Sequence, residues 1–130
     1  MPSRALLLAI VVLGGLAAGC GDDERPPDPA DAVRAAASAY LDALRGARWA
    51  EACDRMSPAA RAAVAEGGGS CAGVLGGGGA LPRDTLDSVA RQLAGAPVRV
   101  SGARATLGPV GDLPEPLRFA RRDGRWLLAP

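Results

Sequence analysis

The sequence predicts an α+β fold, with N-terminal helices packed on a C-terminal antiparallel sheet of about four strands. Three observations predict it. Apolar residues recur at helical spacing from about residue 29 to residue 93, and after Pro97 they alternate with polar residues at every second position. The pair Asp123-Gly124 lies between two alternating runs and indicates a tight hairpin. The 130 residues are enough for one domain.

The first nineteen residues have the layout of an export signal. Arg4 gives a positive start, Ala5–Leu13 is a continuous apolar run, and small residues fill most of Gly14–Gly19. This apolar stretch is too short to span a bilayer, whose hydrocarbon core needs about 20 apolar residues. We therefore expect residues 1–19 to be a signal peptide, and its last residues indicate a lipoprotein signal peptide.

The signal ends in Leu16-Ala17-Ala18-Gly19-Cys20, which resembles a lipobox. In a lipobox the peptide is cut before the cysteine, whose thiol is joined to diacylglycerol. Ala17 stands where leucine or another aliphatic residue is usual. We expect lipidation at Cys20 and a protein anchored to the extracytoplasmic face of the cell membrane. The alternative is an ordinary cleavable signal with a chance cysteine.

The cysteine count agrees with export. Three cysteines in an exported chain leave one unpaired unless Cys20 carries lipid, in which case Cys53 and Cys71 remain as a pair. Because the exported compartment is oxidising, we expect these two to form a disulfide. Two thiols without histidine do not complete a zinc site, and neither has the neighbouring base or CxxC motif of a reactive thiol.

A short polar segment follows Cys20. Gly21–Pro27 is acidic, contains proline and has nothing to bury. We expect residues 20–28 to be the lipidated cysteine and a disordered tether, and residues 29–130 to be the folded domain. Seven tether residues reach at most about 25 Å, which keeps the domain near the bilayer.

The first helix begins at a clear cap. Asp28 is a good N-cap residue, and Pro29 suits the first helical position. Gly46 is expected to end the helix. Its apolar face consists of Val33, Ala37, Tyr40, Leu41 and Leu44.

Four further helical segments are expected before the sheet. They are a stripe from Trp49 to Met56, Ala59–Glu66 with Ser57-Pro58 as its start, one turn over Cys71–Leu75, and Pro82–Leu93. Two glycine runs, Gly67–Gly69 and Gly76–Gly79, lack the lysine and hydroxyl of a phosphate loop and are expected to be flexible connectors.

The strands follow Pro97. We expect two around Gly102, with Val98 and Val100 in the first and Ala103–Leu107 as the second, then a loop over Pro109–Pro116. The terminal hairpin joins Leu117–Arg122 to Arg125–Ala129, and a two-residue turn pairs Phe119 with Leu128 and Arg121 with Trp126. One face then holds Leu117, Phe119, Trp126 and Leu128, and the other holds Arg118, Arg122 and Arg125. A solvated surface is the simpler interpretation of these arginines.

The charge pattern excludes several functions. The formal net charge is +1, so no broad field favours nucleic acid, and we expect no nucleic-acid partner. Histidine is absent, which excludes a histidine triad and a zincin, and lysine is absent, which excludes a P-loop. We expect no metal and no cofactor. Without residues 1–19 the chain has 14 arginines and 14 acidic residues, so we expect no electrostatic attachment to anionic lipid.

The helix-first order, the alanine-rich first helix ending Tyr40-Leu41-Asp42-Ala43-Leu44, and the hairpin Asp-Gly-Arg-Trp-Leu-Leu resemble the nuclear transport factor 2-like superfamily. More narrowly, they resemble small secreted bacterial lipoproteins in which two helix-region cysteines sit like Cys53 and Cys71. The resemblance covers residues 29–130 and implies a cystatin-like, cone-shaped sheet that often encloses a pocket. The candidate pocket residues are Tyr40, Trp49, Phe119 and Trp126, for which a place in the core is the alternative.

Three functions stay open at this point. The leading one is a non-catalytic binding module for a small apolar ligand or an envelope protein. The second is an isomerase or cyclase, because the resemblance implies that a first-helix tyrosine, here Tyr40, can donate to an oxyanion. The inner strand face offers no carboxylate for such a reaction. The third is a purely structural domain with a filled cone.

Overall fold

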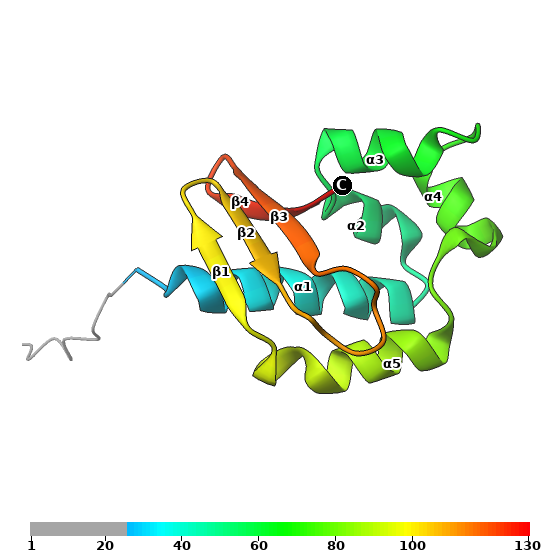
Figure 1. Cartoon of the computed structure of the whole chain (residues 1–130). Helices are drawn as coiled ribbons and strands as arrows, with labels where there is room; N and C mark the ends of the chain where they lie inside the picture. The colour runs from blue at the N-terminus through cyan, green and yellow to red at the C-terminus, as the bar shows by residue number, and fades with distance from the viewer. Residues whose placement is uncertain (1–25) are drawn as a thin grey trace, which may run out of the picture.

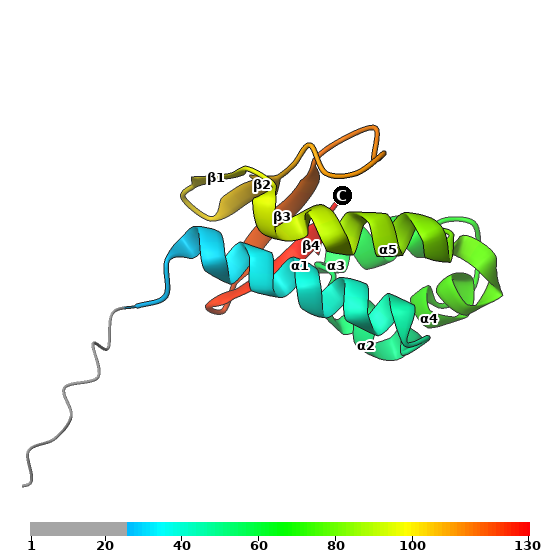
Figure 2. The ribbon, with the colours of Figure 1, turned by 90° about the horizontal axis from the view of Figure 1, so that it is seen from below.

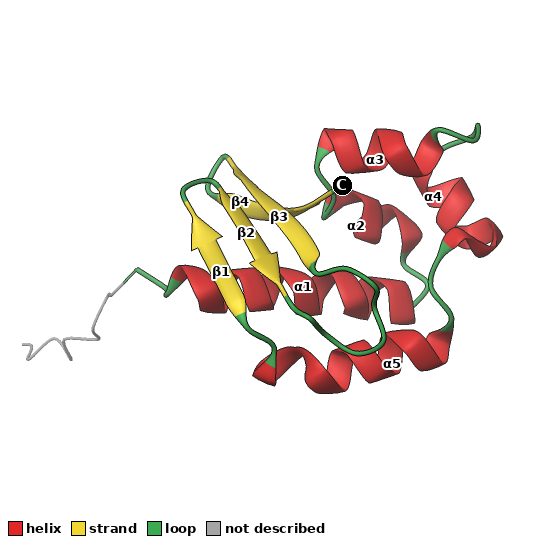
Figure 3. Cartoon of the chain, in the orientation of Figure 1, coloured by secondary structure: helices red, strands yellow, loops and turns green. Residues whose placement is uncertain are grey.

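The computed structural model describes residues 26–130, so the expected signal peptide and Cys20 lie outside the described residues. The helices come first, as α1 (Pro29–Arg45), α2 (Trp49–Asp54), α3 (Pro58–Ala65), α4 (Cys71–Val74) and α5 (Arg83–Gln92). The strands follow, as β1 (Val98–Ser101), β2 (Arg104–Leu107), β3 (Leu117–Arg122) and β4 (Arg125–Ala129). This order, drawn in Figures 1 and 3, confirms the α+β class.

Helix α1 forms as its capping residues predict. The Asp28 carboxylate accepts a hydrogen bond from the Ala30 N–H at 2.8 Å, Pro29 is the first helical residue, and Gly46 follows the last. The expected stripe is buried at Val33, Ala37, Leu41 and Leu44, while Tyr40 is half-buried. The helix therefore presents a continuous apolar face to the sheet.

The chain leaves α2 earlier than the apolar stripe suggests. Met56 lies outside the helix and forms a parallel bridge with Leu128 of β4. The Leu128 N–H donates to the Arg55 carbonyl at 2.9 Å, and the Ser57 N–H donates to the Leu128 carbonyl at 2.7 Å. These backbone hydrogen bonds to the sheet replace the helical ones, and Ser57 then caps α3 through its hydroxyl, which accepts from the Ala60 N–H.

The second glycine run is exposed and contacts α2 only at its first residue, because Gly77 and Gly78 have open space around them and Gly78 departs from helical geometry. After α4 the chain continues in a widened helical turn, Leu75–Gly79. A Cβ at Gly76 would lie 3.0 Å from the Trp49 ring, so glycine permits the close approach of this turn to α2. No such contact surrounds Gly67–Gly69, which links α3 to α4.

The sheet is an antiparallel meander with the strand order β1-β2-β3-β4. Its register confirms the predicted hairpin, because Phe119 pairs with Leu128 and Arg121 pairs with Trp126. The turn residues Asp123 and Gly124 both have positive φ, at 50° and 76°, as a two-residue hairpin turn requires.

Helices cover only one face of this sheet. Helix α1 runs behind the strands in Figure 1, and Figure 2 shows α5 alongside α1. The core lies between these helices and the inner sheet face, where Val33, Val89 and Leu107 are fully buried. Within residues 26–130, no helix crosses the outer face of the sheet, and none is long and apolar enough to cross a bilayer.

Candidate functional site

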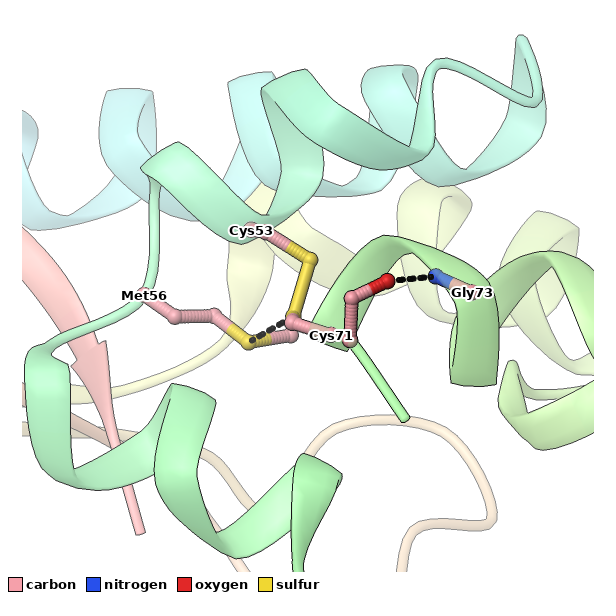
Figure 4. The surroundings of a disulfide bond; sticks show 5 residues. Cys53, Met56, Cys71 and Gly73 are labelled. Atoms are coloured by element: carbon pink, nitrogen blue, oxygen red, sulfur yellow. Dashed lines mark hydrogen bonds between the residues drawn. A yellow bond between two sulfur atoms is a disulfide. The ribbon is translucent and has the colours of Figure 1, made fainter. Parts of the chain in front are cut away.

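The expected disulfide is confirmed. Cys53 in α2 is bonded to Cys71 at the start of α4, with a Cα–Cα distance of 6.2 Å (Figure 4). The Met56 sulfur lies 3.8 Å from the Cys71 sulfur. A disulfide sulfur has no proton, so this dashed contact in Figure 4 is a sulfur–sulfur packing contact. The bond joins α2 to α4, and Met56 links the same region to the sheet through Leu128.

The four candidate pocket residues all belong to or pack against one hydrophobic core. Phe119 is 2% exposed, whereas Tyr40, Trp49 and Trp126 are half-buried. Trp49 lies against Gly76. Neither of the two hollows described below is lined by Tyr40, Trp49 or Trp126. A pocket built from these aromatic side chains therefore stays a prediction.

Tyr40 has the clearest electrostatic perturbation in the described chain. Loss of solvent on burial raises the pKa of its phenol from 10.0 to about 12, because burial penalises the charged phenolate. The phenol therefore stays protonated to a higher pH than that of an exposed tyrosine. The inner faces of the four described strands present Arg121 but no carboxylate.

No group of three or more histidine, cysteine, aspartate or glutamate side chains that could hold a metal occurs within residues 26–130. The same part of the chain contains both disulfide cysteines, whose sulfurs are already bonded to each other.

The outer face of the sheet gathers arginines. Sequence analysis placed three of them, Arg118, Arg122 and Arg125, on one face of the terminal hairpin. The register adds two more, because Arg99 and Arg118 are both cross-strand partners of Thr106, and Arg104 pairs with Ala120. The period-two pattern of the first hairpin already indicates that Arg99 and Arg104 share one face of that hairpin. The pairing of β2 with β3 across a long loop then shows that this is the face of Arg118 and Arg122.

Two hollows border these arginines. The first is about 480 Å³ in volume and lies on the outer sheet face. Its lining residues are Ser57, Ala59, Arg99, Ser101, Arg104, Ala105, Thr106, Arg118, Phe119, Ala120, Arg122, Ala129 and Pro130. The second, about 560 Å³, lies between α2, the start of α3 and the β3–β4 turn. It has mixed charge, with Glu51, Asp54, Arg55, Arg61, Arg122, Asp123 and Arg125 among its lining residues.

The two hollows differ in the acids that surround their arginines. No aspartate or glutamate lines the outer-face hollow, and the only ion pair made by its arginines within residues 26–130 joins Arg118 to Glu115 at 3.6 Å. In contrast, Arg45 in α1 lies 2.8 Å from Asp87 in α5, and Arg48 lies 3.1 Å from Glu51. Of the two hollows, the outer-face hollow is the more uniformly cationic.

The sequence matches no protein-family model, no curated protein and no solved structure.

Proposed function

We propose that this protein is a lipid-anchored lipoprotein of the extracytoplasmic membrane face, and that its α+β domain is a non-catalytic binding module. The observation that supports the proposal is the Cys53–Cys71 disulfide. A disulfide is typical of an oxidising compartment. Of the three cysteines in the sequence, it leaves Cys20 without a partner and therefore free to carry a lipid. Cys20 directly follows the apolar segment whose last residues resemble a lipobox.

The binding surface of the module is the outer face of the sheet. A small apolar ligand in the cone would need space beside Tyr40, Trp49 and Trp126, whereas both described hollows lie elsewhere. An envelope component that meets arginine side chains fits the outer face better. An acidic surface of an envelope protein and a smaller anionic ligand both have this property.

We also propose a distant relationship to the nuclear transport factor 2-like superfamily. The support is the order of helices before an antiparallel sheet and the terminal Asp-Gly hairpin. The coarser statement, an α+β domain with an open four-stranded sheet and a disulfide, does not depend on this relationship.

The lipid anchor is tested by metabolic labelling with a clickable palmitate analogue in a bacterium that processes lipoproteins. The wild-type chain should incorporate the label and sediment with membranes, and Cys20→Ala should incorporate none. The matched control is the double variant Cys53→Ala/Cys71→Ala, which should still be labelled because its lipobox is intact. Cleaved wild-type protein without label, recovered in the soluble fraction, would overturn the anchor.

The rival function is an isomerase or cyclase that uses Tyr40. The observation that favours it is the half-buried position of Tyr40 on the apolar face of α1, where its protonated phenol can donate a hydrogen bond. Tyr40→Phe removes the donor and keeps the ring. If the protein had such an activity, this variant would lose most of it, while binding at the outer sheet face would stay unchanged.

A further inference from the structure

We propose that the outer-face hollow is a binding site for a ligand that carries two or more phosphate groups. The inference deepens the proposed function and rests on it, since it names the ligand class of the binding module. The site is the hollow of about 480 Å³ lined by Arg99, Arg104, Arg118 and Arg122.

The register sets the spacing of these four arginines. Arg99 and Arg118 stand two strands apart, on either side of Thr106. Neighbouring strands are separated by about 4.8 Å, so these two side chains start about 10 Å from each other. Arg104 lies on the strand between them, two residues along from Thr106. A ligand with several anionic groups can therefore meet separate guanidinium groups.

Three of the four arginines of the hollow have no acidic partner among the described residues. Arg99, Arg104 and Arg122 make no ion pair within residues 26–130, and the Arg118–Glu115 pair is solvent-exposed. Arg122 lies directly opposite Arg125, and like charges at opposed positions of a sheet destabilise it. A bound polyanion relieves this repulsion.

The donor set fits phosphate better than carboxylate. A guanidinium presents a planar fork of N–H donors that matches two oxygens of a phosphate or of a carboxylate, so the number of donors decides between the two. Four such groups, with the hydroxyls of Ser101 and Thr106 on the same lining, offer more donors than one carboxylate can accept. The volume of the hollow lies within the range of about 300–1,000 Å³ that is common for small-molecule sites.

The test uses residues 21–130, exported behind a signal peptide that is cleaved without lipidation. This chain contains the complete buried core, which runs from Val33 to Phe119. Titration calorimetry with inorganic tripolyphosphate should show saturable binding. The double variant Arg104→Gln/Arg118→Gln should bind at least tenfold more weakly. The matched control Arg83→Gln/Arg91→Gln removes the same charge from exposed positions on α5 and should bind within twofold of wild type.

Two comparisons identify the source of the phosphates. Citrate carries several carboxylates and no phosphate, and it should bind at least tenfold more weakly than tripolyphosphate. Vesicles of phosphatidylglycerol and phosphatidylcholine present lipid phosphates. If they bind the wild-type chain and not the Arg104/Arg118 variant, the site takes lipid headgroups. If tripolyphosphate binds and the vesicles do not, the site takes a soluble or polymeric phosphate.

Three results would overturn the inference: no binding of either probe, equal binding of citrate, or an equal loss in the α5 control. Any of these would leave the lipid anchor untouched, because palmitate labelling at Cys20 decides that part separately. Conversely, an unlabelled Cys20 together with Arg104-dependent tripolyphosphate binding would reject the anchor and keep the site.

Discussion

The helical part of the domain, residues 29–97, and the sheet part, residues 98–130, differ in their balance of basic and acidic residues. The helical part has seven arginines and seven acidic residues, and several of them form ion pairs, of which Arg45–Asp87 at 2.8 Å is the shortest. The sheet part has six arginines and three acidic residues. The near-zero net charge of the chain therefore conceals a cationic sheet beside a balanced helical layer.

The difference follows from the geometry of the two kinds of element. On a helix, residues three or four apart are neighbours, so Arg48 meets Glu51 within one turn. On a sheet, a residue meets its cross-strand partner, and the register brings Arg122 opposite Arg125. On the helices, arginines thus form ion pairs with acidic residues close in the sequence. In the sheet, the pairing of distant strands places several arginines on one face.

The largest effect is expected from a substitution that removes packing between the helical part and the sheet part. Phe119→Ala removes a side chain that is 2% exposed at the contact between sheet and helices, and it should lower the free energy of unfolding by about 3–5 kcal/mol. Arg118 directly precedes Phe119 and lies on the opposite face, so Arg118→Ala should change the free energy of unfolding by less than about 0.5 kcal/mol. Urea denaturation of the 21–130 chain measures both. Similar losses for the two variants would contradict the assignment of the faces.

The disulfide should contribute the next largest effect, and it acts within the helical part. Cys53→Ala/Cys71→Ala frees a loop with a sequence separation of 18, and the chain-entropy model predicts a loss of about 3 kcal/mol. Reduction of the wild-type chain should give a similar loss, which urea denaturation with and without reductant measures. Unchanged stability on reduction would show that packing alone holds α4 against α2.

Alkaline pH should loosen the contact of α1 with its surroundings through Tyr40. The folded pKa is about 12 and the unfolded value is 10.0, so the unfolded chain loses its proton first. The stabilisation is complete below pH 10 and is lost as the pH rises through 12, by up to about 2–3 kcal/mol. The sequence has one tyrosine and no lysine, so few other groups titrate there. Tyr40→Phe should show a flat profile in thermal denaturation between pH 9 and pH 11.5; an equally steep profile would contradict the assignment.

The smallest effect is that of removing one arginine charge, which should change the free energy of unfolding in opposite directions in the two parts. Arg122→Gln removes a like charge from the sheet and should raise the free energy of unfolding by up to about 0.5 kcal/mol at low salt. Arg45→Gln breaks the pair with Asp87 and should lower it by up to about 1 kcal/mol. Thermal shifts at low and at 1 M salt measure the difference, which should shrink at 1 M because salt screens both interactions. Equal signs at low salt would refute the charge contrast.

Several features of the fold were predictable because they depend on neighbours in the sequence. Asp28-Pro29 marks the start of α1, and Asp123-Gly124 defines the terminal hairpin with its register. The cysteine count led to the Cys53–Cys71 pair without any geometry. The early end of α2 was not predictable, because the Arg55 carbonyl and the Ser57 N–H form their backbone hydrogen bonds with Leu128, more than 70 residues away.

The candidate site likewise has features that depend on neighbours in the sequence and features that depend on distant residues. Sequence alone determined that Arg118, Arg122 and Arg125 share a face, because a two-residue turn fixes which residues alternate together. Only the tertiary structure decided that Arg99 and Arg104 join Arg118 and Arg122 around one hollow, because this depends on the pairing of β2 with β3 across the loop between these strands. The tertiary structure also keeps aspartate and glutamate out of the lining of this hollow, whereas Glu51 and Asp54 share the second hollow with Arg122 and Arg125. Local patterns determine the elements and their faces, whereas the position of charge in space depends on long-range pairing.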